Sequence, residues 1–149
     1  MECWSCLSNK GVRRISPGPT IYEGEHWTVE HAYPVATTGW LVIVLKRHAE
    51  ALHELTASEF AELAGLQKEL VRFLFEELHC QKEYISCYAE AEHFHHVHFH
   101  VYAKPPDLPS NLKGGKSFAL IKVKEDDSIV KEDIIAFCEL LKGRFDRLK

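Results

Sequence analysis

The chain has 149 residues, of which 46% are hydrophobic and 27% charged, and its formal net charge is −4. That length is enough for one domain with a buried core, so we expect a single domain over residues 1–149. The mild negative net charge argues against electrostatic binding of extended nucleic acid over a broad surface, although a local positive patch could still bind one nucleotide. No apolar run approaches the roughly 18 residues of a membrane span, and the N-terminus lacks a signal-peptide layout. We therefore expect a cytoplasmic protein.

Short β-rich runs come first along the chain. Three predicted strands lie at residues 20–23, 26–30 and 40–46. Glycine and proline residues between them mark turns. Thr56-Ala57-Ser58-Glu59 then has the pattern of a capping box. The apolar residues that follow it recur at helical spacing, which predicts a helix to about His79.

The second half of the chain continues with β-structure. Residues 83–89 and 95–103 predict two strands joined as a hairpin, and residues 118–123 predict a last strand after a loop. Apolar residues between 134 and 145 predict a closing amphipathic helix. Strands first, one long helix and then a hairpin indicate an α+β fold. We expect an antiparallel sheet of about five strands, one long helix and a C-terminal helix.

Histidines are concentrated in the last strand of this hairpin. Five of the ten histidines lie between His93 and His100. Because alternate side chains of a strand share a face, His96, His98 and His100 should point one way and the apolar residues between them toward the core. A solvated polar face is one interpretation, but β-propensity would favour threonine or tyrosine there. A zinc-binding fork and a neutral imidazole acting as a nucleophile are the two chemical alternatives.

The cysteines give a second pattern. There are five cysteines. Because the number is odd and the expected compartment is reducing, we do not expect a disulfide framework. Cys3 and Cys6 form a C-x-x-C pair, which suits a metal knuckle or a redox pair. The remaining three, Cys80, Cys87 and Cys138, are interpreted as small buried hydrophobic residues.

The run from His96 to Tyr102, HVHFHVY, resembles the signature of the histidine triad (HIT) superfamily of nucleotide hydrolases and transferases. Residues 39–48 resemble the strand of that family that leads to a lysine, a variable residue and a histidine, and the capped helix follows at the usual distance. The resemblance covers roughly residues 3–123. It implies a HIT-like fold, and by analogy a homodimer.

The resemblance also implies a mechanism. His98, the middle histidine, would attack the α-phosphorus of a nucleotide and form a nucleotidyl-histidine, which water or another acceptor resolves. His100 would support and orient the site. Imidazole is substantially neutral at pH 7, and a backbone carbonyl can fix its tautomer. The implied substrates are nucleoside phosphoramidates, dinucleoside polyphosphates or similar nucleotides.

Several positions depart from the family pattern and bear on substrate binding. Glu92 and His93 stand where many relatives carry Gln and then Ser or Thr. Glu92 would turn away from phosphate or contact a cationic part of the substrate, and His93 is either a general acid for the leaving group or a turn residue. His31 occupies the ribose-contacting position. Lys116 ends a Lys-Gly-Gly-Lys run that either cradles a phosphate or is a flexible loop.

Zinc-binding bacterial members of the family provide the interpretation of the N-terminal cysteines. The resemblance implies that Cys3, Cys6, His48 and His96 hold a structural Zn²⁺, because two thiolates and two imidazoles close a tetrahedral site. The alternative is two free surface thiols, with both histidines lining the active site.

Two further function classes remain open at this point. Residues 2–9 resemble the start of the splicing-associated CwfJ-type domains, which are HIT-like binding proteins of RNA processing without clear catalytic activity. The intact triad and the acidic balance favour an enzyme over such a domain. A zinc hydrolase that uses the triad itself as metal ligands would leave Cys3 and Cys6 without a purpose.

Overall fold

The computed structural model describes residues 2–149. Over this range the chain forms one antiparallel sheet of five strands in the order β1-β2-β3-β5-β4. The strands are β1 (Tyr22–Glu23), β2 (Trp27–His31), β3 (Trp40–Leu45), β4 (Glu83–Ser86) and β5 (His98–Ala103). The α-helices are α1 (Trp4–Asn9), α2 (Ala57–Leu78) and α3 (Lys131–Asp146). The predicted α+β fold with a five-stranded antiparallel sheet is confirmed.

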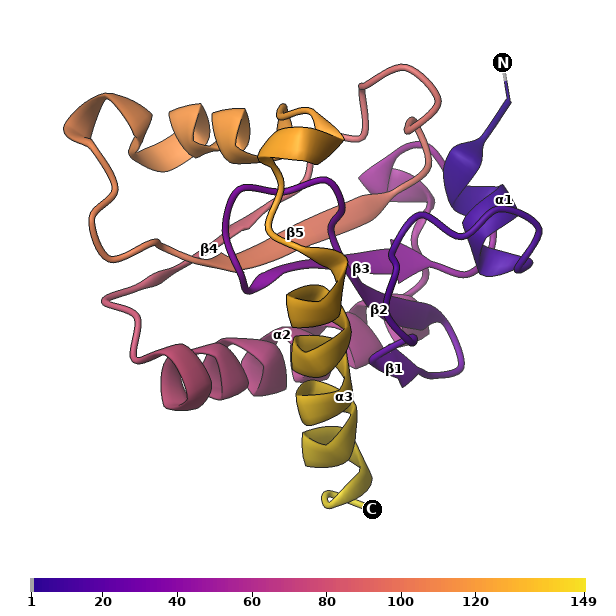
Figure 1. Cartoon of the computed structure of the whole chain (residues 1–149). Coiled ribbons are helices and arrows are strands. Elements are labelled where there is room, and N and C mark those ends of the chain that lie inside the picture. Colours follow the sequence, from indigo (N-terminus) through magenta and orange to yellow (C-terminus); the bar gives the residue numbers. More distant parts are fainter. Residues whose placement is uncertain (1) are drawn as a thin grey trace.

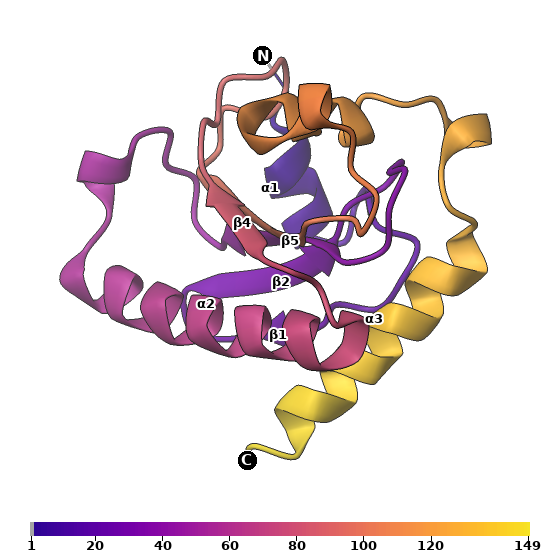
Figure 2. The ribbon, with the colours of Figure 1, turned by 90° about the vertical axis from the view of Figure 1, so that its left-hand side faces the viewer.

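The two faces of the sheet have different partners. Figures 1 and 2 show α2 along one face, while α1 and the 3-10 turns that follow β5 lie on the opposite side. These turns are Ser110–Leu112, Gly114–Ile121 and Glu125–Asp127. The core lies between the sheet and α2, and it includes Ile43, Val101 and Phe73. The second face is therefore the one left for a binding site.

Strand register determines which side chains share that second face. Val42 pairs with Glu30 on one side and with His100 on the other, and Val44 pairs in the same way with Thr28 and His98. Directly paired residues point to the same face of a sheet. His98 and His100 thus lie on the face away from α2, as the alternation in the sequence predicts.

Helix α2 begins and ends close to the predicted residues. Thr56 is its N-cap and accepts a hydrogen bond from the Glu59 amide, while the Glu59 carboxylate accepts one from the Thr56 amide. This reciprocal pair is the capping box expected from the sequence. His79 ends the helix in the left-handed conformation, with φ of 52°. The buried face of α2 then covers the sheet.

The structure differs from the sequence predictions at three places after α2. Strands β4 and β5 pair as expected, but they are shorter than predicted and residues 87–97 connect them. The predicted strand at 118–123 is wrong, because 3-10 turns occupy Gly114–Ile121. Ser117 is tied down there by hydrogen bonds of 2.6 Å to the Tyr102 hydroxyl and to the Gly114 carbonyl. No helix within residues 2–149 has the length and apolar character needed to cross a membrane.

Candidate active site and metal cluster

A cavity of about 850 Å³ lies over the triad face of the sheet. His98 and His100 line it from β5, and α1 forms part of its wall. The 87–97 loop and the turns after β5 contribute further sides, including Phe94 and Phe118. A concave site with a few convergent polar groups is the usual form of a small-molecule pocket.

His98 is held in one tautomer by the backbone. Its Nδ1 lies 2.7 Å from the His96 carbonyl oxygen. Because a carbonyl only accepts, Nδ1 donates its proton, and the lone pair of the neutral ring is on Nε2. Burial lowers the pKa of His98 below its usual value, which favours this neutral form. The ring is therefore a neutral imidazole with its lone pair on Nε2 rather than a cation.

His100 lies beside His98, with ring centroids 5.0 Å apart. The indole Nε1–H of Trp40 donates to Nδ1 of His100 over 2.9 Å. Burial lowers the pKa of His100 to about 3, so this ring also stays neutral at physiological pH. The two neighbouring histidines thus present opposite tautomers, with a lone pair on Nε2 of His98 and a proton on Nε2 of His100.

Cys3, Cys6, His48 and His96 come together at the edge of this site. Their ligand atoms all lie within 4.8 Å of one another. The Nδ1 of His96 lies 3.5 Å from each sulfur, and the Nδ1 of His48 lies 3.4 Å from the Cys6 sulfur. Sulfur and nitrogen ligands of tetrahedral zinc stand roughly 3.5 Å apart, given Zn–S and Zn–N bonds of about 2.3 and 2.0–2.1 Å. The four residues fit a structural zinc ion.

The outer nitrogens of the two cluster histidines support the same assignment. Nε2 of His96 donates to the Leu45 carbonyl over 2.6 Å, and Nε2 of His48 donates to the Glu50 carboxylate over 2.8 Å. Each bond leaves Nδ1 with a lone pair directed at the cluster. Metal-bound histidines commonly have such partners, which fix the tautomer of the ligand.

His31 lines the cavity, but both of its ring nitrogens already have backbone partners. Nδ1 donates to the Ala32 carbonyl over 2.8 Å, and Nε2 accepts the Gly39 amide over 3.0 Å. Gly39 has φ of +90°, a conformation that suits glycine. The His31 ring therefore holds the β2–β3 connection together, and neither ring nitrogen is left to bind a ribose hydroxyl.

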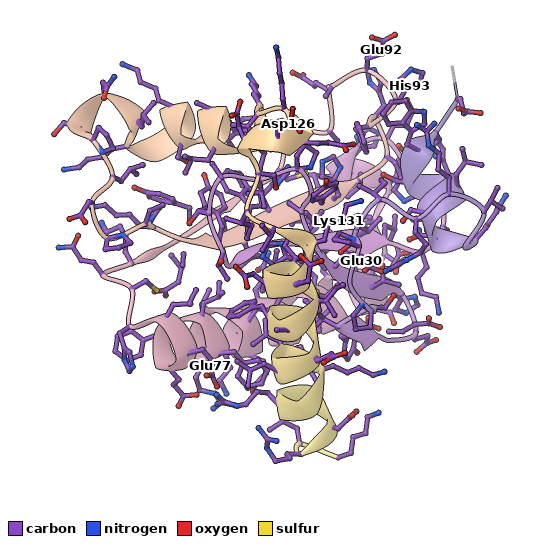
Figure 3. The ribbon with its side chains drawn as sticks, in the orientation of Figure 1. Glu30, Glu77, Glu92, His93, Asp126 and Lys131 are labelled. Atoms are coloured by element: carbon purple, nitrogen blue, oxygen red, sulfur yellow. The ribbon has the colours of Figure 1, made fainter. Side chains whose placement is uncertain are left out.

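The structure places Glu92, His93 and Lys116 outside the lining of the cavity. Figure 3 shows Glu92 at the tip of the 87–97 loop, pointing outward, with His93 below it near α1. His93 adopts φ of 69°, stacks on Trp4 at 4.4 Å and contacts the Glu2 carbonyl at 2.9 Å. These contacts join the loop to the N-terminal segment. Lys116 is an exposed residue of the Gly114–Ile121 turns.

Several cavity residues did not emerge from the sequence. Glu30 shares the triad face, and Arg14 donates to its two carboxylate oxygens over 2.7 and 3.0 Å. Lys131, the first residue of α3, also lines the cavity, and its Nζ lies 5.4 Å from the centroid of the Tyr33 ring. Strand alternation puts Glu30 and His31 on opposite faces of β2, and the pairing of β2 with β3 and of β3 with β5 shows that Glu30 is on the triad face. No sequence signal points to Arg14 or Lys131, which come from segments far apart in the chain.

Comparisons with known proteins agree with this geometry. A family described as "Scavenger mRNA decapping enzyme C-term binding" matches residues 5–114. No protein among the curated sequences matches the chain.

Solved structures match over nearly the whole length. A hypothetical histidine triad nucleotide-binding protein from Sulfolobus tokodaii is 18% identical, with a TM-score of 0.69 over 99% of this chain and 94% of that one. A zinc-bound histidine triad family protein from Mycobacterium smegmatis is 19% identical, with a TM-score of 0.66 over 99% and 97%. The Plasmodium falciparum diadenosine triphosphate hydrolase is 10% identical, with a TM-score of 0.63 over 86% and 76%. At these identities the likeness is one of fold.

The family match covers α1 from its second residue, the whole sheet and the triad, and the fold matches histidine triad structures over 99% of the chain. The chain belongs to the scavenger decapping C-terminal family of histidine triad proteins.

Proposed function

We propose that this protein is a nucleotide hydrolase or nucleotidyltransferase whose nucleophile is Nε2 of His98. The hydrogen bond from His98 Nδ1 to the His96 carbonyl carries the proposal, because it leaves the lone pair on the other nitrogen of a cavity-lining ring. The fold likeness to a diadenosine triphosphate hydrolase supports the same class of chemistry. The substrate class is a nucleotide with a leaving group on its α-phosphorus, such as a dinucleoside polyphosphate or a nucleoside phosphoramidate.

The reaction proceeds in two displacements. The Nε2 lone pair bonds to the α-phosphorus while the bond from phosphorus to the leaving oxygen or nitrogen breaks. The leaving group departs with that electron pair and takes a proton from solvent. Water, or another acceptor, then attacks the phosphorus and loses a proton, and the P–N bond to His98 breaks. This covalent route divides one difficult displacement into two easier ones.

Charged residues of the cavity wall suit a nucleotide. Four cationic side chains, Arg13, Arg14, Lys122 and Lys131, line the cavity together with three carboxylates, Glu30, Glu90 and Glu125. Arg14 is paired with Glu30, so the other cations are the ones that give the wall a small positive excess despite the negative net charge of the chain. Such a patch attracts phosphate groups.

Glu30 lies two strands from His100, a separation of roughly 10 Å. Oε1 of Glu30 accepts from Arg14 and Thr20, whereas Oε2 accepts only from Arg14 and keeps a second lone pair. We assign this Oε2, rather than His31, to the ribose hydroxyls.

Zinc has a structural part in this proposal. When bound, it would crosslink α1 to the start of β5 and to the residues after β3, because four protein ligands close its coordination. His96 then has two duties. Its ring belongs to the cluster, and its backbone carbonyl fixes the tautomer of His98.

Replacement of His98 tests the proposal. His98→Ala should reduce turnover of dinucleoside polyphosphates and phosphoramidates by several orders of magnitude while nucleotide binding stays measurable, because a nucleophile acts mainly in the transition state. Wild-type protein quenched during turnover should carry a nucleotidyl adduct on His98 by mass spectrometry. His53→Ala, at an exposed histidine outside the cavity, is the matched control. A His98→Ala variant that keeps its rate on every nucleotide would refute the assignment.

A further inference from the structure

Trp40 begins β3, is fully buried, and pairs with Tyr102 on the same face of the sheet as His100. Its ring stacks on Tyr102, with centroids 3.6 Å apart and planes within 9°. Phe118 packs edge-on against both Trp40 and His100, at 5.4 and 4.8 Å. These aromatic contacts fix the indole plane from several sides. The Nε1–H group therefore has a defined direction, and it points at Nδ1 of His100.

The indole nitrogen settles the tautomer of His100. Tryptophan Nε1–H can only donate a hydrogen bond. The 2.9 Å contact thus requires an unprotonated Nδ1 on His100. The neutral ring must then carry its proton on Nε2. The other tautomer would bring two N–H groups together in a buried setting, where an unsatisfied donor is costly.

We propose that Trp40 is a positioning residue that keeps His100 as a fixed Nε2–H donor for the phosphoryl group on His98. This inference rests on the proposed function of His98. Since indole cannot accept a proton, His100 cannot pass one inward through Nδ1. His100 therefore donates a hydrogen bond to a non-bridging phosphoryl oxygen, where negative charge is concentrated, and does not act as a proton relay. Donors that are already aligned with developing charge contribute strongly to catalysis.

The test removes the N–H group and keeps the shape. Trp40 is replaced in the full chain by β-(3-benzothienyl)alanine, in which sulfur stands in place of N–H, and separately by Phe. We expect kcat to fall about tenfold with KM nearly unchanged. This factor corresponds to the net free energy of one hydrogen bond lost in the transition state. Nitrogen-15 NMR of the histidine rings, recorded without substrate, should show Nε2-protonated His100 in the wild type and a mixture of tautomers in both variants.

Trp27 provides a matched control. It is also fully buried, and its Nε1–H donates to the Glu59 carbonyl over 2.8 Å, on the core side of the sheet. The same replacements at Trp27 should lower the unfolding temperature but leave kcat per folded molecule and the His100 tautomer unchanged. This comparison separates loss of the N–H group at the triad from general destabilisation.

The outcomes divide clearly. If the benzothienylalanine variant at position 40 keeps wild-type kcat or a wholly Nε2-protonated His100, the positioning role of Trp40 is wrong. If Trp27 replacements reduce kcat as much as Trp40 replacements, the effect is structural and the inference is also wrong. If His98→Ala turns over nucleotides as fast as the wild type, the proposed function is refuted instead. The NMR spectra then still decide whether Trp40 sets the tautomer of His100.

Discussion

Four histidines of this chain have different tasks because their second ring nitrogens have different partners. A backbone carbonyl takes the Nδ1 proton of His98, and another takes the Nε2 proton of His96. His100 receives an indole N–H at Nδ1. His31 is bonded at both nitrogens. Which nitrogen carries the proton is set by the hydrogen bond at the other one, so identical side chains differ in which ring nitrogen offers a lone pair and which offers a proton. The proposed nucleophile and donor roles of His98 and His100 depend on this difference.

His31 gives a prediction for the pH dependence of stability. Burial lowers the pKa of His31 to about 4 from an ordinary value of 6.5. Between those values the unfolded chain binds a proton that the folded chain excludes, so stability falls as the pH falls through this window. Urea unfolding at pH 7 and pH 5 should show a smaller loss for His31→Gln than for the wild type, by about 2 kcal/mol. An equal loss in both proteins would refute this role.

At the scale of the elements, one carboxylate joins the end of β3 to the start of α2. Glu59 belongs to the capping box of α2, and it also receives Nε and Nη2 of Arg47 over 2.7 and 2.8 Å. Arg47 further donates to the Glu54 carbonyl. A charge-assisted, bidentate pair has both strength and a defined geometry. The pair fixes the first turn of α2 against Arg47. Arg47 directly precedes His48, one of the four residues of the metal site.

Acid should weaken this junction. The Arg47 guanidinium holds the pKa of Glu59 down to about 2. A depressed carboxyl pKa stabilises the fold above the unfolded value near 4.5, and this contribution is lost as the pH falls toward 2. Glu59→Gln should therefore lower the urea midpoint at pH 7, and the gap from the wild type should narrow between pH 4.5 and 2.

The surface pair of Glu69 with Arg72 offers the control. Exposed pairs contribute little, so Glu69→Gln should leave the midpoint nearly unchanged across the same pH range. A constant gap between Glu59→Gln and the wild type down to pH 2 would contradict the role of the Glu59 charge.

Sequence predicts some of these elements better than others. Helix α2 was predictable because a capping box and a long apolar repeat act locally and agree with each other. Residues 118–123 have the composition of a strand. However, Ser117 is hydrogen-bonded to Tyr102 and Phe118 packs on His100, and the segment forms turns over the cavity. Short apolar runs are decided by such tertiary contacts.

The candidate site divides in the same way. His98 and His100 follow from their alternation and from the family resemblance, since both signals are contained in one short run. The contact of Trp40 with His100 depends on where the indole lies between β3 and β5. The pairing of Arg14 with Glu30 depends on how the N-terminal segment crosses β2. Contacts between distant segments leave no local pattern in a single sequence.

At the scale of the whole molecule, the metal cluster links the cavity wall to the triad. Helix α1 has only six residues, far fewer than an isolated helix needs for stability in water. It supplies Trp4 and Asn9 to the cavity wall. Its anchors are the cysteine cluster, the stacking of Trp4 on His93 and a hydrogen bond from Asn9 to the Leu45 carbonyl. The cluster should therefore hold both the wall and His96 in place.

We expect one zinc ion per chain in protein purified without added metal, measured by elemental analysis. Cys3→Ser should lower both the zinc content and the unfolding temperature, because structural metal binding is coupled to folding. It should also weaken nucleotide binding, since the α1 wall loses an anchor. Removal of zinc from the wild type with a chelator should reproduce all three effects and change the fluorescence of Trp4, whose ring lies against His93 and Arg13.

Cys87→Ser is the control for loss of a cysteine that does not bind the metal, because Cys87 is a half-buried free thiol outside the four ligands. This variant should keep its zinc and its affinity for nucleotides. Readdition of Zn²⁺ should restore the chelated wild type but not Cys3→Ser, since one ligand of the latter is missing. If the metal-free wild type has the same unfolding temperature as the zinc-bound protein, Trp4 and Asn9 hold α1 without the metal. Zinc would then have no structural role.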